Sequence, residues 1–237
     1  LMVIGPTLYF SANDGTHGKE LWKSDGTTAG TVMVKDINSG YGDGYSMAYA
    51  KPPTAIGTTI YFRANDGIHG DELWKSDGTA AGTVMVKDVN TGPDYSTGNY
   101  QSQMVTAYGT SYKYCGSTNC GSNSKDASLN VIDDVLYFAA NDGIHGDELW
   151  TSDGTAAGTV MVADINSGAA DAFPRPEGNH YNLEGKLNYM YYGMSDSWYP
   201  MFAVLNDVVF FAADDGTHGL ELYALRKSST GTYSDDN

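Results

Sequence analysis

The sequence has few basic residues and no long apolar segment. Lys and Arg number 13 against 29 Asp and Glu, which gives a formal net charge of −16. Because such a surface repels phosphate backbones and anionic membrane faces, we expect no nucleic-acid partner and no membrane insertion. No apolar run approaches the roughly 20 residues that cross a bilayer. The chain begins with Leu1 and shows no targeting segment, so we expect a processed chain whose export signal has been removed.

Cysteine is almost absent as well. The two cysteines, Cys115 and Cys120, lie in the short polar stretch YCGSTNCGS. A local disulfide between them would suit an oxidising compartment, which favours an extracellular or cell-surface location. Zinc is the weaker interpretation, because two thiolates need two more ligands and no His lies nearby in the sequence.

Catalytic motifs are missing from the sequence. We find no GxSxG, Walker-type or HExxH pattern, and the titratable groups recur in near-identical form along the chain instead of forming one asymmetric set. We therefore expect that the chain is not an enzyme and has no catalytic residues. A glycoside hydrolase or lyase that uses two carboxylates stays open as an alternative, because the sequence cannot place such a pair in one cleft.

What the sequence does contain is a repeat. Three near-identical segments start at Phe10, Phe62 and Phe138, and a fourth starts at Phe211 and then decays. A basic unit of about 50 residues follows. We divide the chain, as a single repeat domain, into units 1–50, 51–128, 129–200 and 201–237. Loop insertions at about 93–128 and 169–200 follow the last strand of a copy, so we expect them on the same side of the molecule.

Each unit contains four short apolar runs, which in the first copy are LMVI, TLYF, ELW and TVMV. Some of these runs are apolar on both faces, which indicates sheets that are covered on both sides. Asp-Gly pairs between the runs supply hairpin turns, and helix signals are nearly absent. The sequence predicts an all-β, β-propeller-like fold of four repeats, each of about four antiparallel strands. An open sandwich or solenoid array is the alternative.

The fourth copy lacks the second Asp-Gly turn and the TVMV run. We therefore expect an open sheet edge there. The chain's own N-terminal strand would complete this edge in a closed ring, and a neighbour's strand would complete it in a polymer.

The segments HGKELWKSDGTTAGT, HGDELWKSDGTAAGT and HGDELWTSDGTAAGT resemble the ELWxxDGT repeat of large bacterial and archaeal extracellular proteins. The resemblance covers about residues 1–92, 129–168 and 201–225. It implies a propeller-like β fold, export and a role at the cell surface, and it implies no established catalytic residues. The fourth copy departs from the pattern at Tyr223 and at residues 224–226, which puts simple ring closure in doubt.

Each copy places a His three residues before a Glu. In a Gly-flanked loop we expect the imidazole to hold the turn by hydrogen bonds to the backbone and the carboxylate to cap backbone amides, in preference to a metal or acid–base role. The pairs are His17/Glu20, His69/Glu72, His145/Glu148 and His218/Glu221.

Carboxylates in the Gly-rich loops are candidate calcium ligands, because calcium prefers hard oxygen donors. Their spacing matches no known calcium loop, and Asp-Gly is also an ordinary hairpin turn, so turn formation stays open as the alternative. The candidates are Asp14, Asp25, Asp66, Asp77, Asp142 and Asp153.

Aromatic residues fall into two groups. Trp22, Trp74 and Trp150 occupy one repeated position, so we expect them in the core or between units. The second insertion carries aromatics without a counterpart in the other copies. They could stack on sugars, form a protein contact or cover a small extra core. They are Tyr189, Tyr191, Tyr192, Trp198 and Tyr199.

These observations favour a non-catalytic extracellular structural or adhesion protein. It would be a surface or filament building block that assembles through β-repeat edges and insertion loops, with itself or with other surface proteins. A carbohydrate-binding module that holds glycans on the Tyr/Trp-rich insertion is the alternative. Calcium is the one candidate cofactor, with turn formation by the same carboxylates as the alternative.

Overall fold

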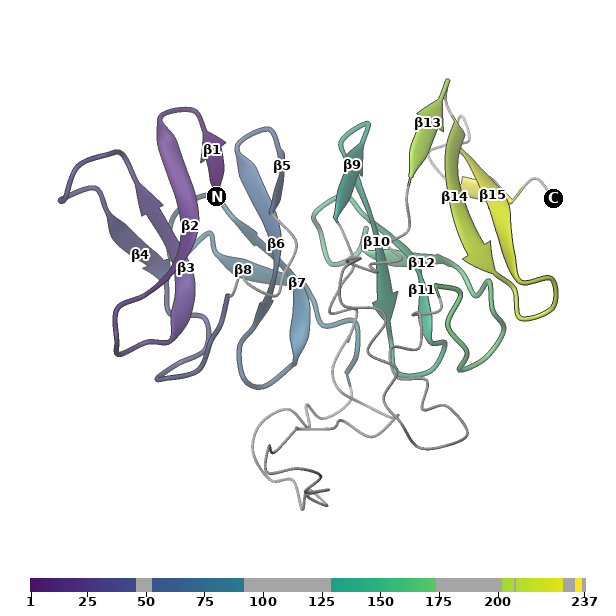
Figure 1. Cartoon of the computed structure of the whole chain (residues 1–237), viewed down its shortest axis with the longest axis horizontal. Coiled ribbons are helices and arrows are strands. Elements are labelled where there is room, and N and C mark those ends of the chain that lie inside the picture. The colour runs from purple at the N-terminus through teal and green to yellow at the C-terminus, as the bar shows by residue number, and fades with distance from the viewer. Residues whose placement is uncertain (46–52, 92–128, 174–201, 207, 228–232, 236–237) are drawn as a thin grey trace, which may run out of the picture.

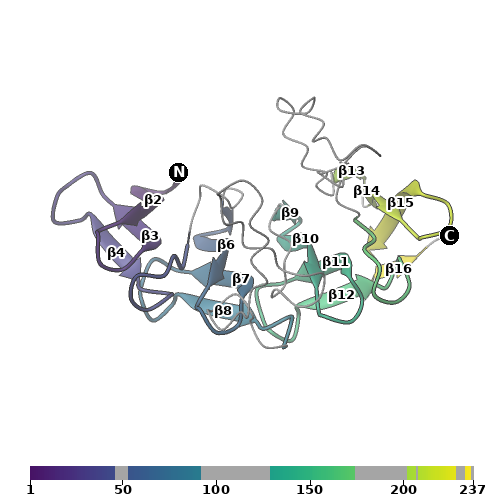
Figure 2. The same cartoon turned by 60° about the horizontal axis from the view of Figure 1, so that its bottom comes forward.

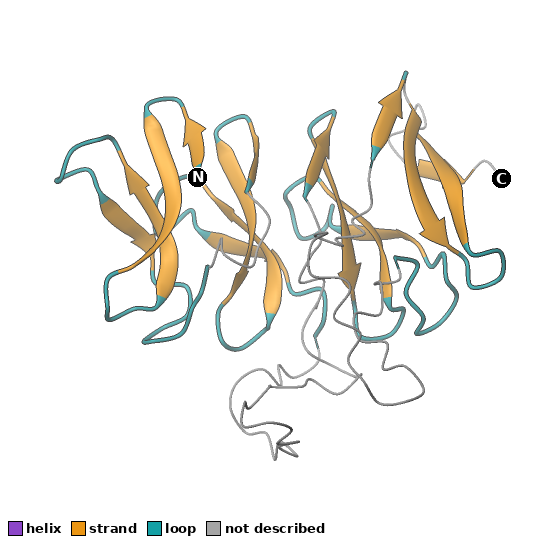
Figure 3. Ribbon diagram, viewed as in Figure 1, coloured by secondary structure: helices purple, strands orange, loops and turns teal. Residues whose placement is uncertain are grey.

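The computed structural model describes residues 1–45, 53–91, 129–173, 202–206, 208–227 and 233–235. These residues form strands, turns and loops, and none of them is helical (Figure 3). Accordingly, the described part of the chain has no helix with the length and apolarity of a membrane span.

The strands form four separate sheets, one for each sequence copy. Sheet 1 contains β1 (Met2–Ile4), β2 (Thr7–Asn13), β3 (Lys19–Ser24) and β4 (Val32–Lys35). Sheet 2 contains β5 (Thr54–Ile56), β6 (Thr59–Asn65), β7 (Asp71–Ser76) and β8 (Val84–Lys87). Sheet 3 contains β9 (Asn130–Ile132), β10 (Val135–Asn141), β11 (Asp147–Ser152) and β12 (Val160–Ala163). Sheet 4 contains β13 (Ala203–Leu205), β14 (Val208–Asp214), β15 (Leu220–Lys227) and β16 (Tyr233–Asp235).

In every sheet the strands follow one another in chain order and pair antiparallel. This confirms the predicted all-β, propeller-like fold of four four-stranded repeats. Successive side chains on a strand point to opposite faces of the sheet, so each sheet has two distinct faces. The register places Phe10 opposite Trp22 and Tyr9 opposite Lys23. We call the side that carries Phe10 and Trp22, or their equivalents, the tryptophan face, and the side that carries Tyr9 and Leu21 the leucine face.

The sheets pack in a fixed order, with the leucine face of one on the tryptophan face of the next. Three buried clusters fill the three joints. The joint between sheets 1 and 2 contains Tyr9, Leu21, Val34, Ile37, Tyr45, Ile60, Phe62, Ala64 and Trp74. The joint between sheets 2 and 3 contains Tyr61, Leu73, Val86, Val89, Leu136, Phe138, Ala140 and Trp150. The joint between sheets 3 and 4 contains Tyr137, Ala139, Leu149, Ala172, Phe173, Val209, Phe211, Ala213 and Leu225.

An inner sheet is therefore covered on both faces, as its apolar runs predict. Every residue of β11 is buried, and so are the five central residues of β10. In sheet 1, by contrast, only one residue of β2 is buried. The difference follows from position in the row, because among the described sheets sheet 1 has a neighbour on one face only.

Figures 1 and 2 show the four sheets as an open, curved row, with sheet 1 at one end and sheet 4 at the other. The two end sheets do not meet, so the row does not close into a ring. As a result, the tryptophan face of sheet 1 and the leucine face of sheet 4 are not covered by any other described sheet.

The edge of sheet 4 corrects one prediction. We expected the fourth copy to lack a fourth strand. Strand β16, near the C-terminus of the chain, pairs with β15, with Leu225 opposite Asp235. Backbone pairing needs no apolar pattern, which is why a polar tail can supply this strand. The chain's own tail therefore completes the edge, in place of its N-terminal strand or a neighbour's strand.

Candidate functional site

The hairpin between the second and third strands is built on one Asp and one His. In sheet 1, Asp14 Oδ1 accepts hydrogen bonds from the backbone N–H of Thr16 at 2.8 Å and of His17 at 3.0 Å. Asp14 Oδ2 lies 2.7 Å from His17 Nδ1. The bond from the imidazole, followed by the backbone bonds, lowers the pKa of Asp14 to about 2, and the same bond raises the pKa of His17. The imidazole thus holds the turn through the Asp carboxylate and not, as we expected, through the backbone.

The same arrangement recurs in the other three sheets. The His Nδ1 to Asp Oδ2 distance is 2.7 Å for His69 and Asp66, 2.7 Å for His145 and Asp142, and 2.8 Å for His218 and Asp215. A contact that recurs four times at one place in the fold fits a turn-forming role.

In sheets 1, 2 and 3, the Glu that follows the His binds the chain that leaves the sheet, whereas Glu221 in sheet 4 is exposed. Glu20 is fully buried, and its carboxylate accepts hydrogen bonds from the backbone N–H of Ile37 and of Gly44, each at 3.0 Å. Glu148 accepts hydrogen bonds from the backbone N–H of Ile165 and of Asn166, as Glu20 does from Ile37 and Asn38. Burial raises the pKa of both Glu20 and Glu148 to about 7. The predicted capping of backbone amides is observed for Glu20, Glu72 and Glu148; for Glu221 it stays a prediction.

The second turn, between the third and fourth strands, uses Asp25 and its equivalents. Asp25 Oδ1 accepts hydrogen bonds from the backbone N–H of Thr27 at 2.9 Å and from its hydroxyl at 2.7 Å. These bonds lower the pKa of Asp25. Asp77 and Asp153 make the same two contacts with Thr79 and Thr155.

All six candidate calcium ligands are thus engaged in turns of their own. Within the described ranges, no group of three or more His, Cys, Asp or Glu side chains is arranged to hold a metal ion. Calcium binding by Asp14, Asp25, Asp66, Asp77, Asp142 and Asp153 stays a prediction.

Lysines that we did not single out in the sequence connect neighbouring sheets. Lys23 Nζ donates to the carbonyl of Gly78 at 2.7 Å, and Lys35 Nζ donates to the carbonyl of Thr83 at 2.7 Å. Lys35 Nζ also lies over the Trp74 ring, 5.6 Å from its centroid, where a cation is attracted to the aromatic face. Two lysines of one sheet therefore hold the turn between the third and fourth strands of the next.

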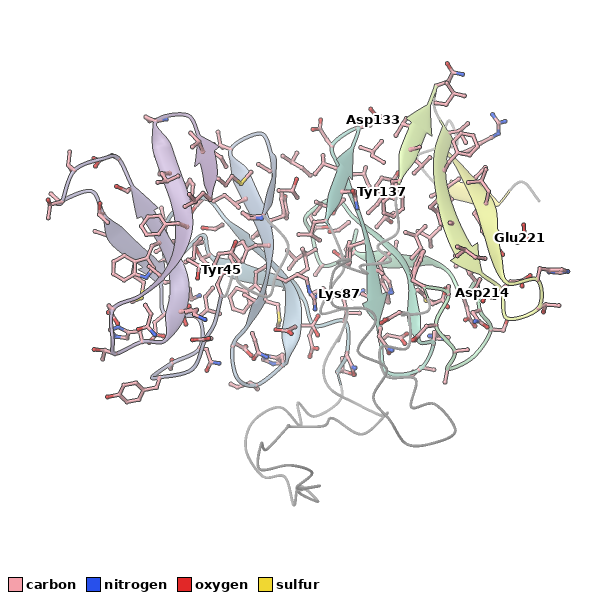
Figure 4. All side chains as sticks on the ribbon, in the orientation of Figure 1. Tyr45, Lys87, Asp133, Tyr137, Asp214 and Glu221 are labelled. Carbon is pink, nitrogen blue, oxygen red and sulfur yellow. The ribbon has the colours of Figure 1, made fainter. Side chains whose placement is uncertain are left out.

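Sheets 2 and 3 repeat this contact. Lys75 Nζ donates to the carbonyl of Gly154 at 2.8 Å, and Lys87 Nζ donates to the carbonyl of Thr159 at 2.7 Å. Figure 4 shows Lys87 between sheets 2 and 3 and Tyr45 between sheets 1 and 2.

A signal for these lysines was present in the sequence. The third copy has Thr151 and Ala163 at the two lysine positions, and the copy that follows it has lost the Asp-Gly-Thr turn. The lysine pair is therefore present where the next copy has the turn and absent where it does not. Reading each copy against its successor would have found the contact.

A tyrosine completes each of these joints. The Tyr9 hydroxyl lies against Gly78, and the Tyr61 hydroxyl lies against Gly154. Both glycines have positive φ angles, 85° and 84°, and an added Cβ would overlap the tyrosine oxygen. Gly26 in sheet 1 has a φ of 90°, yet nothing lies within 4 Å of the position of its Cβ.

The exposed faces of the two end sheets are the most distinctive surfaces of the molecule. Phe62 and Trp74, on the tryptophan face of sheet 2, are 1% and 5% exposed, whereas Phe10 and Trp22 on sheet 1 are only half-buried. At the other end of the row, Leu222 is 73% exposed, although its equivalents Leu21, Leu73 and Leu149 are buried. The prediction that the tryptophans pack between units is confirmed for Trp74 and Trp150, and Trp22 lies on an end face.

Several predicted sites lie outside the described residues, namely Cys115, Cys120, Tyr189, Tyr191, Tyr192, Trp198 and Tyr199. The first insertion, 93–128, lies wholly outside them. Of the second insertion, which we placed from about residue 169, the structure describes the first residues, and Ala172 and Phe173 are buried in the joint between sheets 3 and 4.

No family model and no curated protein sequence matches the chain. Two solved structures are similar in fold. One is described as xyloglucan PUL GH43B of Bacteroides ovatus, at 15% identity and a TM-score of 0.31, and the match covers 99% of this chain and 39% of the other. The second is an endo-arabinase from Bacteroides thetaiotaomicron, at 12% identity and a TM-score of 0.28, covering 98% of this chain and 75% of the other. The chain thus spans about two fifths of the length of the first.

These comparisons correct our prediction that the chain is not an enzyme. We drew that prediction from the repetition of near-identical units, but both similar structures carry the names of glycoside hydrolase-type enzymes. At these identities the likeness concerns the fold alone.

Proposed function

We propose that this protein is an extracellular building block of a cell surface, which assembles through the exposed faces of its two end sheets. The insertions after sheets 2 and 3 would add lateral contacts to itself or to other surface proteins. The observation that carries the proposal is the contrast between inner and end faces: the same apolar positions are buried at each inner joint and accessible at the ends of the row.

The chemistry of the end faces supports this role. The leucine face of sheet 4 exposes Leu205, Leu220 and Leu222, at 65%, 50% and 73%. Large apolar side chains that are exposed on one face of a sheet are typical of interaction surfaces. Because every inner joint puts a leucine face on a tryptophan face, contact between the two ends would be head-to-tail, and a head-to-tail contact that does not close generates an open filament.

The charge of the chain fits a location outside the cell. A net charge of −16 keeps isolated chains apart at low ionic strength, and salt or divalent cations screen that repulsion. We therefore propose that assembly is favoured by salt and by calcium.

The test is sedimentation velocity over a range of protein concentrations, together with electron microscopy in calcium and after chelation. The proposal predicts larger particles as concentration rises, built end to end. The variant Val3→Asp places a charge on the tryptophan face of sheet 1, where Val3 is 69% exposed and opposite Leu8, and should prevent growth.

Val32→Asp is the matched control. Val32 is 40% exposed, and its equivalents Val84 and Val160 stay 36% and 46% exposed inside formed joints, so this position lies outside the contact. A wild-type protein that is monomeric at all concentrations and in both ionic conditions would remove the proposal.

A further inference from the structure

The geometry points to a particular partner for the tryptophan face of sheet 1: the leucine face of a further sheet of the same repeat that carries a tyrosine and two lysines. This inference rests on the proposed assembly through end faces and specifies the partner. Sheet 4 of another copy of this chain can make the apolar contact but lacks these polar groups, so we expect it to bind more weakly.

The receiving side of the contact is already formed in sheet 1. Ser24 and Thr31 hydroxyls lie 2.7 Å apart, as do those of Ser76 and Thr83 in sheet 2. In sheet 2 both residues are fully buried beneath sheet 1, whereas Thr31 is exposed. The turn of sheet 1 thus has the conformation of a turn in a joint, without a sheet over it.

The same turn presents the two places at which a preceding sheet makes contact. Gly26 is equivalent to Gly78. In the joint between sheets 1 and 2, the Tyr9 hydroxyl and the Lys23 ammonium contact Gly78. Thr31 is equivalent to Thr83, whose carbonyl accepts the bond from Lys35. The open space beside Gly26 is therefore the volume that a tyrosine hydroxyl fills at both equivalent positions.

The supplying side identifies the partner. In sheets 1 and 2 the register places a tyrosine opposite a lysine, Tyr9 with Lys23 and Tyr61 with Lys75. In sheet 4 the same positions hold Phe210 opposite Ala224, so neither the hydroxyl nor the ammonium is present. The leucine faces of sheets 1 and 2 carry the full set but are covered by their own neighbours. A suitable face must therefore come from a repeat other than the four described sheets.

The experiment restores the missing groups in the full chain. A donor protein carries Phe210→Tyr and Ala224→Lys, together with Val3→Asp to block its own receiving face. It is titrated into wild-type protein as the acceptor, and association is measured by sedimentation velocity. The expected result is a 1:1 complex at least about tenfold tighter than that formed by a donor with Val3→Asp alone, because a hydrogen bond from a charged group that contributes about 1.4 kcal/mol changes affinity tenfold.

Acceptor variants then locate the contact. An acceptor with Val3→Asp should lose the complex, and one with Val32→Asp should keep it. The inference is overturned if the restored groups leave the affinity unchanged, or if the Val3→Asp acceptor binds as well as the wild type. If the wild-type protein assembles but the restored groups do not change the affinity, the proposed function stands and this inference is removed. If the wild-type protein alone is monomeric but binds the restored donor, the preference of the sheet 1 face for these groups stands and the proposed self-assembly is removed.

Discussion

Truncation of one repeated leucine at two positions tests whether the joints between sheets stabilise the fold. Leu149 is fully buried between sheets 3 and 4, and Leu222 occupies the same position in sheet 4 with 73% of its surface exposed. Replacement of a buried leucine by alanine removes apolar contacts and leaves a cavity, which costs roughly 2–5 kcal/mol. About a quarter of the Leu222 surface is buried, and a quarter of the value for full burial is about 0.5 kcal/mol.

Chemical denaturation of Leu149→Ala and Leu222→Ala, followed by tryptophan fluorescence, measures both changes in the free energy of unfolding. We expect a difference of at least about 1.5 kcal/mol between the two variants, from the lower end of the cavity cost less the exposed-site cost. Equal losses would refute the reasoning, since they would mean that the stacking of sheets does not decide the burial of this position.

Three further predictions concern the joints. Gly154→Ala should destabilise the protein more than Gly26→Ala in thermal unfolding, because both glycines have similar positive φ angles but only at Gly154 would the added Cβ overlap the Tyr61 hydroxyl; equal shifts would contradict this. Lys75→Met should cost about 1–2 kcal/mol in urea, because it removes a charged donor from the Gly154 carbonyl at a half-buried site; an unchanged midpoint would contradict this. The pKa of Glu148 is raised above its ordinary value of 4.5 to about 7, so its contribution to stability is complete below about pH 4.5 and is lost as the pH rises through 7. Glu148→Gln should make the fall in stability over that range shallower, and an unchanged slope would count against a buried, proton-binding carboxylate.

Much of the fold could be predicted because each copy repeats the same pattern of apolar runs and turn residues. The apolar runs and Asp-Gly turns place four strands per copy. Runs that are apolar on both faces predict coverage on both faces, which β10 has; in β2, at the end of the row, only Tyr9 is buried. Turn chemistry and strand alternation act locally, so they are visible in a single sequence.

Features that depend on pairing between distant segments could not be predicted in this way. The strand β16 forms from a polar tail because the backbone of β15 is available for pairing. No side-chain pattern in the tail predicts a strand. The lysine contacts join residues 48 to 79 positions apart, and reading one copy at a time conceals them. The open row is a third case, since closure depends on how sheets 1 and 4 lie relative to each other.

The central claim is that the tryptophan face of sheet 1 becomes a joint on assembly, and the accessibility of one side chain tests it directly. Hydroxyl-radical labelling of Trp22 and Trp74 can be compared in dilute protein and in the assembled state. We predict that Trp22, half-buried in the single chain, becomes protected in the assembly, while Trp74, 5% exposed, stays protected throughout. Trp22 labelled equally in both states would contradict the account.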